Sequence, residues 1–137
     1  ELQAALGVSQ MERLDEFIVK RRALQERYDL LLSSLPIVKP YQDQDNYSAL
    51  HLYPIQIDKV KSTRKEIFKA LRKNDIGVNV HYIPVHTQPY YENMGFKKGD
   101  YPNAENYYER AISIPMFQGL TIEMQDEVVN ALKKVLA

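Results

Sequence analysis

The feature that most constrains the fold of this chain is an apolar stripe that recurs at helical spacing through its first 35 residues. Steps of three and four residues place the stripe on one face of a helix. Its members are Leu14, Phe17, Ile18, Leu24, Tyr28, Leu31 and Leu32. The pattern predicts helix over residues 1–35, with a break or kink at residues 7–9. Pro36 ends this helix, because the residue before a proline avoids helical backbone angles.

Extended segments follow the first helix. Residues 37–40 are a short strand candidate, and residues 47–57 are the clearest strand, because Tyr53, Ile55 and Ile57 alternate with their neighbours. The first half of that strand is apolar on both faces, which is typical of a strand buried on both sides. Pro54 indicates an edge position or a bulge. Residues 78–82 are predicted to form another strand.

Capping signals mark the remaining helices. Ser62 or Thr63 can begin a helix over the residues that follow, and Glu66 completes a capping box with Thr63. Gly77 is available for a left-handed angle after that helix. Residues 103–111 are predicted to be a short helix, residues 113–117 to be extended, and Thr121 to cap the last helix. This order predicts an α/β or α+β fold, with a small mixed or antiparallel sheet of about three or four strands covered by helices on one side. The first and last helices should pack together.

Composition limits the classes of function. The chain has 137 residues, enough for one domain, and its formal net charge of +0 provides no overall field for nucleic acid or an anionic membrane. It has no cysteine, which excludes disulfides and thiolate metal sites and suits a cytoplasmic location. No apolar run approaches the length of a bilayer-spanning helix. The N-terminus lacks the features of a signal peptide.

Histidine and tyrosine cluster after the predicted strand at residues 78–82. His81, Tyr82, His86, Tyr90 and Tyr91 provide neutral donors, acceptors and flat ring faces on which a base or a sugar can rest. The alternative is that Tyr90 and Tyr91 fill a core beneath the loop. The sequence leaves both interpretations open.

Other chemistries find little support. The spacing of His81 and His86 is not that of a helical zinc site, and the third imidazole, His51, is better explained as a core histidine, so no metal site is predicted. Ser62 and Ser113 lack the glycine-flanked elbow of hydrolases, and no glycine-rich phosphate loop is present. Arg110 is expected to pair with Glu105 or Glu109, or to face a partner.

Several stretches, in order, cover almost the whole chain and carry a resemblance to a known family. They are AALGVSQMERLDEF at residues 4–17 with KRR at 20–22, HLYPI at 51–55, GVNVHYIPVH at 77–86 with QPYY at 88–91, PNAE at 102–105, SIPMF at 113–117 and LT at 120–121. Together they resemble the DegT/DnrJ/EryC1/StrS aminotransferases, which act on nucleotide-linked keto-sugars. Within the family, the sequence of these stretches most resembles that of members that use glutamate to aminate a UDP-4-keto-6-deoxy-N-acetylhexosamine on the route to pseudaminic acid.

The resemblance implies the fold of a fold-type I aminotransferase, in which two domains have different roles. Residues 1–137 would be its single C-terminal small domain, and an N-terminal domain absent from this chain would bind pyridoxal phosphate (PLP) through a lysine. No catalytic residue is therefore assigned here. His81, Tyr82, His86 and Tyr90 would bind the nucleotide sugar, and the family is dimeric. The chain has no initiator Met, and as a segment of a longer protein it should expose apolar surface on its first helix or its loop.

Two alternatives remain open at this stage. The chain could be a stand-alone module that binds a nucleotide sugar without catalysis, or a dimerisation domain with no ligand. Weak nucleotide binding with strong self-association would favour the dimerisation domain.

Overall fold

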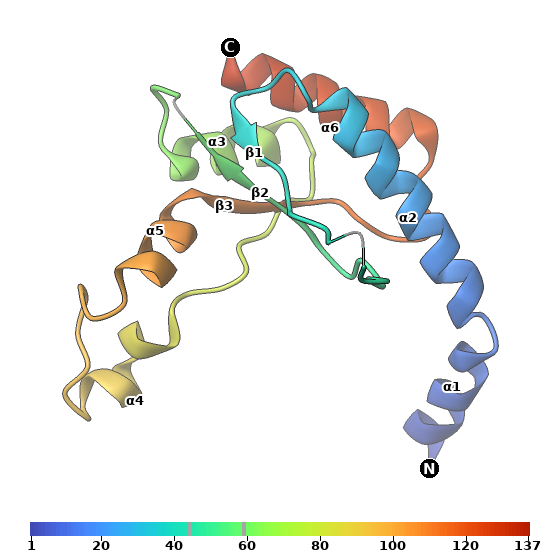
Figure 1. Ribbon diagram of the computed structural model, residues 1–137, viewed down its shortest axis with the longest axis horizontal. Helices are drawn as coiled ribbons and strands as arrows, with labels where there is room; N and C mark the ends of the chain where they lie inside the picture. Colours follow the sequence, from blue (N-terminus) through green and yellow to red (C-terminus); the bar gives the residue numbers. More distant parts are fainter. Residues whose placement is uncertain (44, 59) are drawn as a thin grey trace.

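A three-stranded antiparallel sheet lies at the centre of the computed structural model, which describes residues 1–43, 45–58 and 60–137 (Figure 1). Its order is β1 (Ile37–Val38), β2 (Tyr53–Ile57) and β3 (Ala111–Ile114). β1 pairs only with Gln56 and Ile57, whereas β3 pairs with residues 53–56. Pro54 therefore lies in a central strand, and the predicted edge position is wrong. The missing N–H is tolerated because β1 does not extend as far as Pro54.

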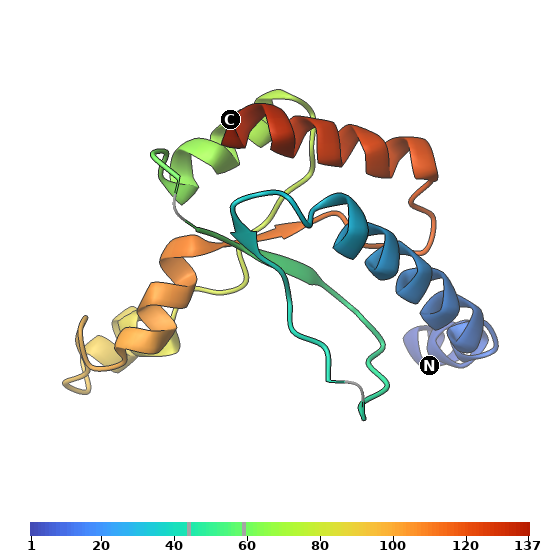
Figure 2. The ribbon, with the colours of Figure 1, turned by 45° about the horizontal axis from the view of Figure 1, so that its top comes forward.

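Helices cover one face of the sheet, as predicted. α2 (Leu14–Leu31), α3 (Arg64–Lys73) and α6 (Ile122–Leu136) surround a common core with the inward side chains of β2. Figure 2 shows α3 and α6 on the same side of the sheet. The first and last long helices pack together as expected, because the buried Gln125 of α6 donates to the carbonyl of Leu24 at 2.8 Å. Tyr28 of α2 packs against Tyr53 of β2, with ring centroids 5.1 Å apart.

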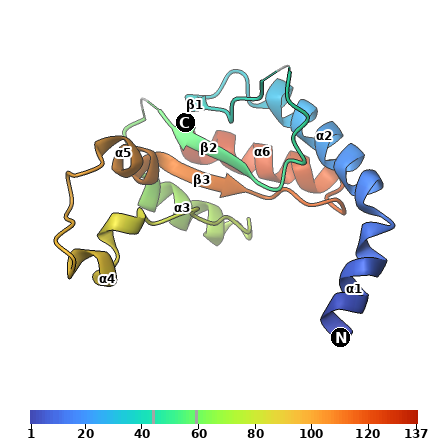
Figure 3. The same ribbon diagram turned by 60° about the horizontal axis from the view of Figure 1, so that its bottom comes forward.

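The N-terminal helix is interrupted, but not where the sequence predicted. α1 (Leu2–Met11) contains Gly7, and the break falls at residues 12–13, before α2. A glycine costs an exposed helix only about 1 kcal/mol, which is too little to stop it. α1 buries none of its residues and projects away from the sheet (Figure 3). Its apolar side chains Leu2, Leu6, Val8 and Met11 are exposed, so the expected apolar surface is present.

The long strand predicted over residues 47–57 is wrong in its first half. β2 begins at Tyr53, and Leu50 has a left-handed φ of 52°, which interrupts extended backbone. The carbonyls of Leu50 and His51 accept hydrogen bonds from the Arg21 guanidinium at 3.1 and 2.9 Å. A side chain of α2 thus replaces a neighbouring strand as the partner of this segment.

The predicted strand at residues 78–82 is reduced to one bridge. Asn79 forms an isolated antiparallel bridge with Ser113 of β3. The side-chain oxygen of Asn79 accepts the N–H of Val80 at 2.8 Å. This local bond competes with the ladder that a continuing strand would need. The left-handed residue before it is Asp75, with φ 59°, and not Gly77 as predicted.

Both predicted helix caps are confirmed. Thr63 and Glu66 form a reciprocal capping box at the start of α3, and the Thr121 hydroxyl accepts the N–H of Met124 at the start of α6. The predicted short helix is α5 (Pro102–Arg110), with proline in its first turn, and it leads directly into β3. Within the described residues, no helix is long and apolar enough to cross a membrane.

Candidate functional site

The histidine-rich loop begins beside β3. Asn79 and Ser113 exchange two backbone hydrogen bonds, at 3.1 and 2.8 Å. Two residues later the Nδ1 atom of His81 lies 2.8 Å from the hydroxyl of Ser113, which is buried in the sheet. The central sheet therefore sets the position of the His81 ring. Tyr82 packs edge-on against that ring, with centroids 4.6 Å apart, and its own side chain is 71% exposed.

His86 is held in a second, more buried arrangement. It lies in the short helix η1 (Val85–Thr87), and its Nε2 atom is 2.8 Å from Oε1 of Glu105 on α5. The two side chains are only 7% and 12% exposed. The same carboxylate oxygen accepts the backbone N–H of Gly99 at 2.7 Å. This hydrogen bond and the bond to His86 hold the pKa of Glu105 below its ordinary value. Glu105 thus joins the start of the loop to its end.

Aromatic rings continue from His86 across the outer part of the loop. Tyr101 packs on His86 at 4.8 Å, Phe96 lies 6.3 Å from Tyr101, Tyr91 lies 6.3 Å from Phe96, and Tyr90 lies 5.2 Å from Tyr91. Several of these rings line a cavity of about 420 Å³ with mostly apolar walls. Its lining residues are Val85, His86, Tyr91, Phe96, Tyr101 and Ala104. Such a concave, mostly apolar surface with a few polar groups suits a small ligand.

The other predicted tyrosine of the site lies on the surface. Tyr90 is in α4 (Pro89–Glu92) and is 70% exposed, and Tyr91 is 36% exposed. The alternative that these two rings fill a core beneath the loop is therefore wrong. The structure brings together two of the four predicted residues, since His81 and Tyr82 are in contact beside β3. His86 and Tyr90 lie apart, at the two ends of the series of aromatic rings.

Two residues that matter to this geometry were not identified as site residues from the sequence. The sequence alone presents Ser113 as a serine without a hydrolase elbow and Glu105 as a candidate partner of Arg110. Ser113 instead orients His81, and Glu105 orients His86. The available signal for Glu105 was its place in the PNAE stretch, three residues after the helix-starting proline.

The described part of the chain contains no residues that are arranged to bind a metal ion or PLP. No group of three or more His, Cys, Asp or Glu side chains there could hold a metal ion. His51 is exposed, which contradicts its interpretation as a core histidine. No described lysine is buried, and the half-buried Lys39 donates its amine to the carbonyl of Asp29 at 2.7 Å. A lysine that forms a Schiff base needs an activating environment, so these residues do not fit a PLP site.

The fold defines a class of protein through its likeness to solved structures. The sugar aminotransferase Spr1654 of Streptococcus pneumoniae, described as putative, superposes in its apo form with a TM-score of 0.89 at 29% identity, over 96% of this chain and 34% of that chain. PseC of Helicobacter pylori, an aminotransferase involved in pseudaminic acid biosynthesis, superposes with a TM-score of 0.88 at 27% identity, over 98% and 36%. The fold is therefore one found within sugar aminotransferases.

The sequence comparison gives the family. The profile of the DegT/DnrJ/EryC1/StrS aminotransferase family matches residues 1–133, and this chain belongs to that family. The spore coat polysaccharide biosynthesis protein SpsC of Bacillus subtilis is 38% identical over 141 aligned residues, which cover 99% of this chain and 36% of that protein. The chain thus spans about a third of the length of the relatives that it matches.

Proposed function

We propose that this chain is the C-terminal small domain of a PLP-dependent aminotransferase that transfers an amino group from glutamate to a nucleotide-linked keto-sugar. The observation that carries the proposal is the loop at residues 81–91, whose two histidines are oriented by buried hydroxyl and carboxylate partners in a chain of this family. Fixed donors and exposed rings at one loop suit the recognition of a polar ligand that carries a base or a sugar.

The exposure of each loop side chain to solvent determines the contact that we propose for it with the nucleotide sugar. Tyr82 and Tyr90 are open to solvent and offer ring faces to a base or a hexose. His81 is half-buried and, with Nδ1 bound to Ser113, keeps Nε2 for a sugar hydroxyl or a diphosphate oxygen. His86 is more deeply buried and lines the mostly apolar cavity.

The cofactor would be bound outside this chain. Bound PLP acts as an electron sink that allows an amino group to move between donor and acceptor. The described lysines are exposed or already engaged, so we assign the PLP site to an N-terminal domain of the same protein. The relatives provide support, since structures of Spr1654 include PMP and PLP forms. This chain would supply part of the wall against which the sugar is positioned.

We further propose that the keto-sugar substrate is a UDP-4-keto-6-deoxy-N-acetylhexosamine. The likeness to PseC supports this choice. We also propose that the protein that contains this chain forms a homodimer and is located in the cytoplasm. The exposed apolar face of α1 is available for contacts with another domain or subunit, and the absence of cysteine suits a reducing compartment.

One observation favours a second candidate, a dimerisation module without ligand. Leu2, Leu6, Val8 and Met11 make α1 apolar and exposed along its length. Such a patch marks an interaction surface. A dimerisation module would associate strongly and would not bind nucleotide sugars.

Binding of a nucleotide sugar tests the proposal. The full-length protein that contains this chain should bind UDP-N-acetylglucosamine in a calorimetric titration, and Tyr82→Ala should weaken binding about tenfold, since aromatic contacts of this kind contribute about 1–3 kcal/mol. Tyr41→Ala changes another exposed tyrosine, outside the loop, and should leave the affinity unchanged. Absence of binding together with self-association would support the dimerisation module instead.

A further inference from the structure

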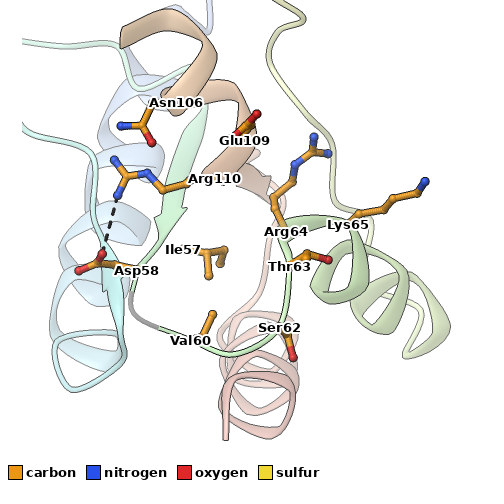
Figure 4. Close-up of a pocket in the computed structure, with 10 residues that line it drawn as sticks. All are labelled: Ile57, Asp58, Val60, Ser62, Thr63, Arg64, Lys65, Asn106, Glu109 and Arg110. Carbon is orange, nitrogen blue, oxygen red and sulfur yellow. Dashed lines mark ion pairs between the residues drawn. The ribbon is translucent and has the colours of Figure 1, made fainter. Parts of the chain in front are cut away.

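A second cavity lies beside the end of α5 and shares no lining residue with the cavity at His86. Its volume is about 480 Å³, and it opens between the end of β2, the start of α3 and the end of α5 (Figure 4). Three cationic and two acidic side chains line it, so its wall carries a net positive charge. They are Arg64, Lys65, Arg110, Asp58 and Glu109. None of the four residues predicted to bind the nucleotide sugar contributes to it.

The two arginines keep unused hydrogen-bonding capacity. The Nε atoms of Arg64 and Arg110 are shielded from solvent and have no hydrogen-bond partner within the described residues. A guanidinium carries five donors, and its Nε–Nη edge matches an oxyanion in a two-point contact. The Arg64 group stacks over the Tyr108 ring at 4.9 Å, which places it without satisfying those donors. The free protein therefore holds two guanidinium groups that an added acceptor would stabilise.

Asp58 acts as a weak resident partner of Arg110. Figure 4 shows the Arg110 side chain turned toward Asp58, with Arg64 across Ile57 on the other side. The ion pair is 3.8 Å long and more than a third of the Asp58 side chain is exposed, so it is weak. Within the described residues, Arg110 donates one hydrogen bond, to the neutral Gln56 at 2.9 Å. The expected pairing of Arg110 with Glu105 or Glu109 is therefore wrong, and Arg110 is able to change partner.

The start of α3 is partly occupied by its own cap. Glu66 accepts the Thr63 N–H at 2.7 Å, and the Thr63 hydroxyl accepts the Glu66 N–H at 3.3 Å. This capping box uses the N–H groups of Thr63 and Glu66, which are two of the donors at the start of the helix. The buried side-chain donors without a partner within the described residues are the two Nε atoms, which come from two different helices.

We propose that this cavity binds a small oxyanion, a phosphate or a carboxylate, between Arg64 and Arg110. Arg110 leaves Asp58 on binding and turns its Nε–Nη edge to the ligand, while Arg64 remains on Tyr108 and contacts the ligand from the other wall. Asp58 is the internal competitor that this exchange displaces. The site is separate from the loop at residues 81–91 and does not depend on the proposed amination reaction.

Calorimetric titration of the full-length protein tests the site, with inorganic phosphate in one arm and succinate in the other at constant ionic strength. Arg110→Gln should lower the affinity about tenfold or more, because it removes a charge-assisted bidentate contact. Asp58→Asn should raise the affinity, because it removes the competitor. Arg72→Gln changes an exposed arginine of α3, the helix that begins at Arg64. It does not line the cavity, so this substitution should change nothing. The arm that shows these effects identifies the ligand as a phosphate or a carboxylate.

A crystal of the same protein soaked in selenate locates the anion directly. An anomalous peak between the side chains of Arg64 and Arg110 is expected, and it should be absent from the Arg110→Gln protein. Affinities that are equal in wild type, Arg110→Gln and Asp58→Asn would overturn the proposal, as would selenate bound elsewhere only. Folding of each variant is checked by its thermal unfolding temperature, and Arg110→Lys provides a second substitution that keeps the charge but loses the fork.

Discussion

Oε1 of Glu105 lies 2.8 Å from Nε2 of His86, and the same oxygen accepts the N–H of Gly99 at 2.7 Å. One carboxylate oxygen therefore joins η1, the turn at residue 99 and α5. The pair is nearly excluded from solvent. A carboxylate in this position favours the Nε2–H form of His86, since an N–H must face an acceptor. Within the described residues, the other ring nitrogen of His86, Nδ1, has no assigned hydrogen bond and is the one that we expect to contact a ligand.

The pH dependence of stability should reveal this pair. The folded protein holds the pKa of Glu105 below its ordinary value of 4.5, chiefly through the Gly99 N–H and then through His86. A depressed pKa contributes stability that is complete above the ordinary value and is lost as the pH falls through the folded value. Glu105→Gln keeps the shape and an acceptor oxygen but does not titrate. Urea unfolding from pH 7 to pH 3 should therefore show a smaller loss of stability for Glu105→Gln than for wild type. Parallel curves would contradict the role of Glu105.

Removing the hydroxyl beside His81 should affect ligand binding more than stability. Ser113→Ala breaks the 2.8 Å contact that orients the His81 ring. A hydrogen bond of this kind contributes about 0.5–1.5 kcal/mol net. We expect the affinity of the full-length protein for UDP-N-acetylglucosamine to fall several-fold and the ¹⁵N shifts of His81 to change. Ser34→Ala, at an exposed position after α2, is the matched control. An unchanged affinity for Ser113→Ala would show that His81 does not need this orientation.

The buried amide between α2 and α6 should be sensitive to a change of polarity. Gln125 is fully buried, donates to the Leu24 carbonyl at 2.8 Å and accepts from Arg27 at 3.1 Å. Gln125→Leu removes both hydrogen bonds, and a typical intramolecular hydrogen bond contributes about 0.5–1.5 kcal/mol net. The midpoint of urea unfolding should fall, with an unchanged slope. Glu127→Gln, on the exposed side of α6, should have little effect.

The capping box of α3 should contribute measurably to stability. Thr63→Ala removes the hydroxyl that accepts the Glu66 N–H, and caps of this type contribute about 1 kcal/mol. Thermal unfolding followed by circular dichroism should show a lower midpoint. Ser62→Ala, next to the cap, serves as the control. Equal effects of the two substitutions would contradict the assignment of Thr63 as the cap.

The sequence predicted those parts of the fold that local chemistry determines. The caps at Thr63 and Thr121 were correct because each depends on bonds within one turn. The start of β2 was misplaced because a distant side chain, Arg21, binds the preceding carbonyls. The role of Glu105 was also beyond local patterns, since 19 positions separate it from His86. Family resemblance identified the loop, but only the folded chain relates its histidines to Ser113 and Glu105.

Product analysis tests the central claim most directly. The full-length protein that contains this chain is incubated with glutamate, PLP and a UDP-4-keto-6-deoxy-N-acetylhexosamine, and the sugar nucleotide is analysed by mass spectrometry. The account predicts a glutamate-dependent 4-amino sugar nucleotide, with 2-oxoglutarate formed in equal amount. An unchanged keto-sugar, with no PLP absorbance in the protein and no binding of UDP-N-acetylglucosamine, would contradict it.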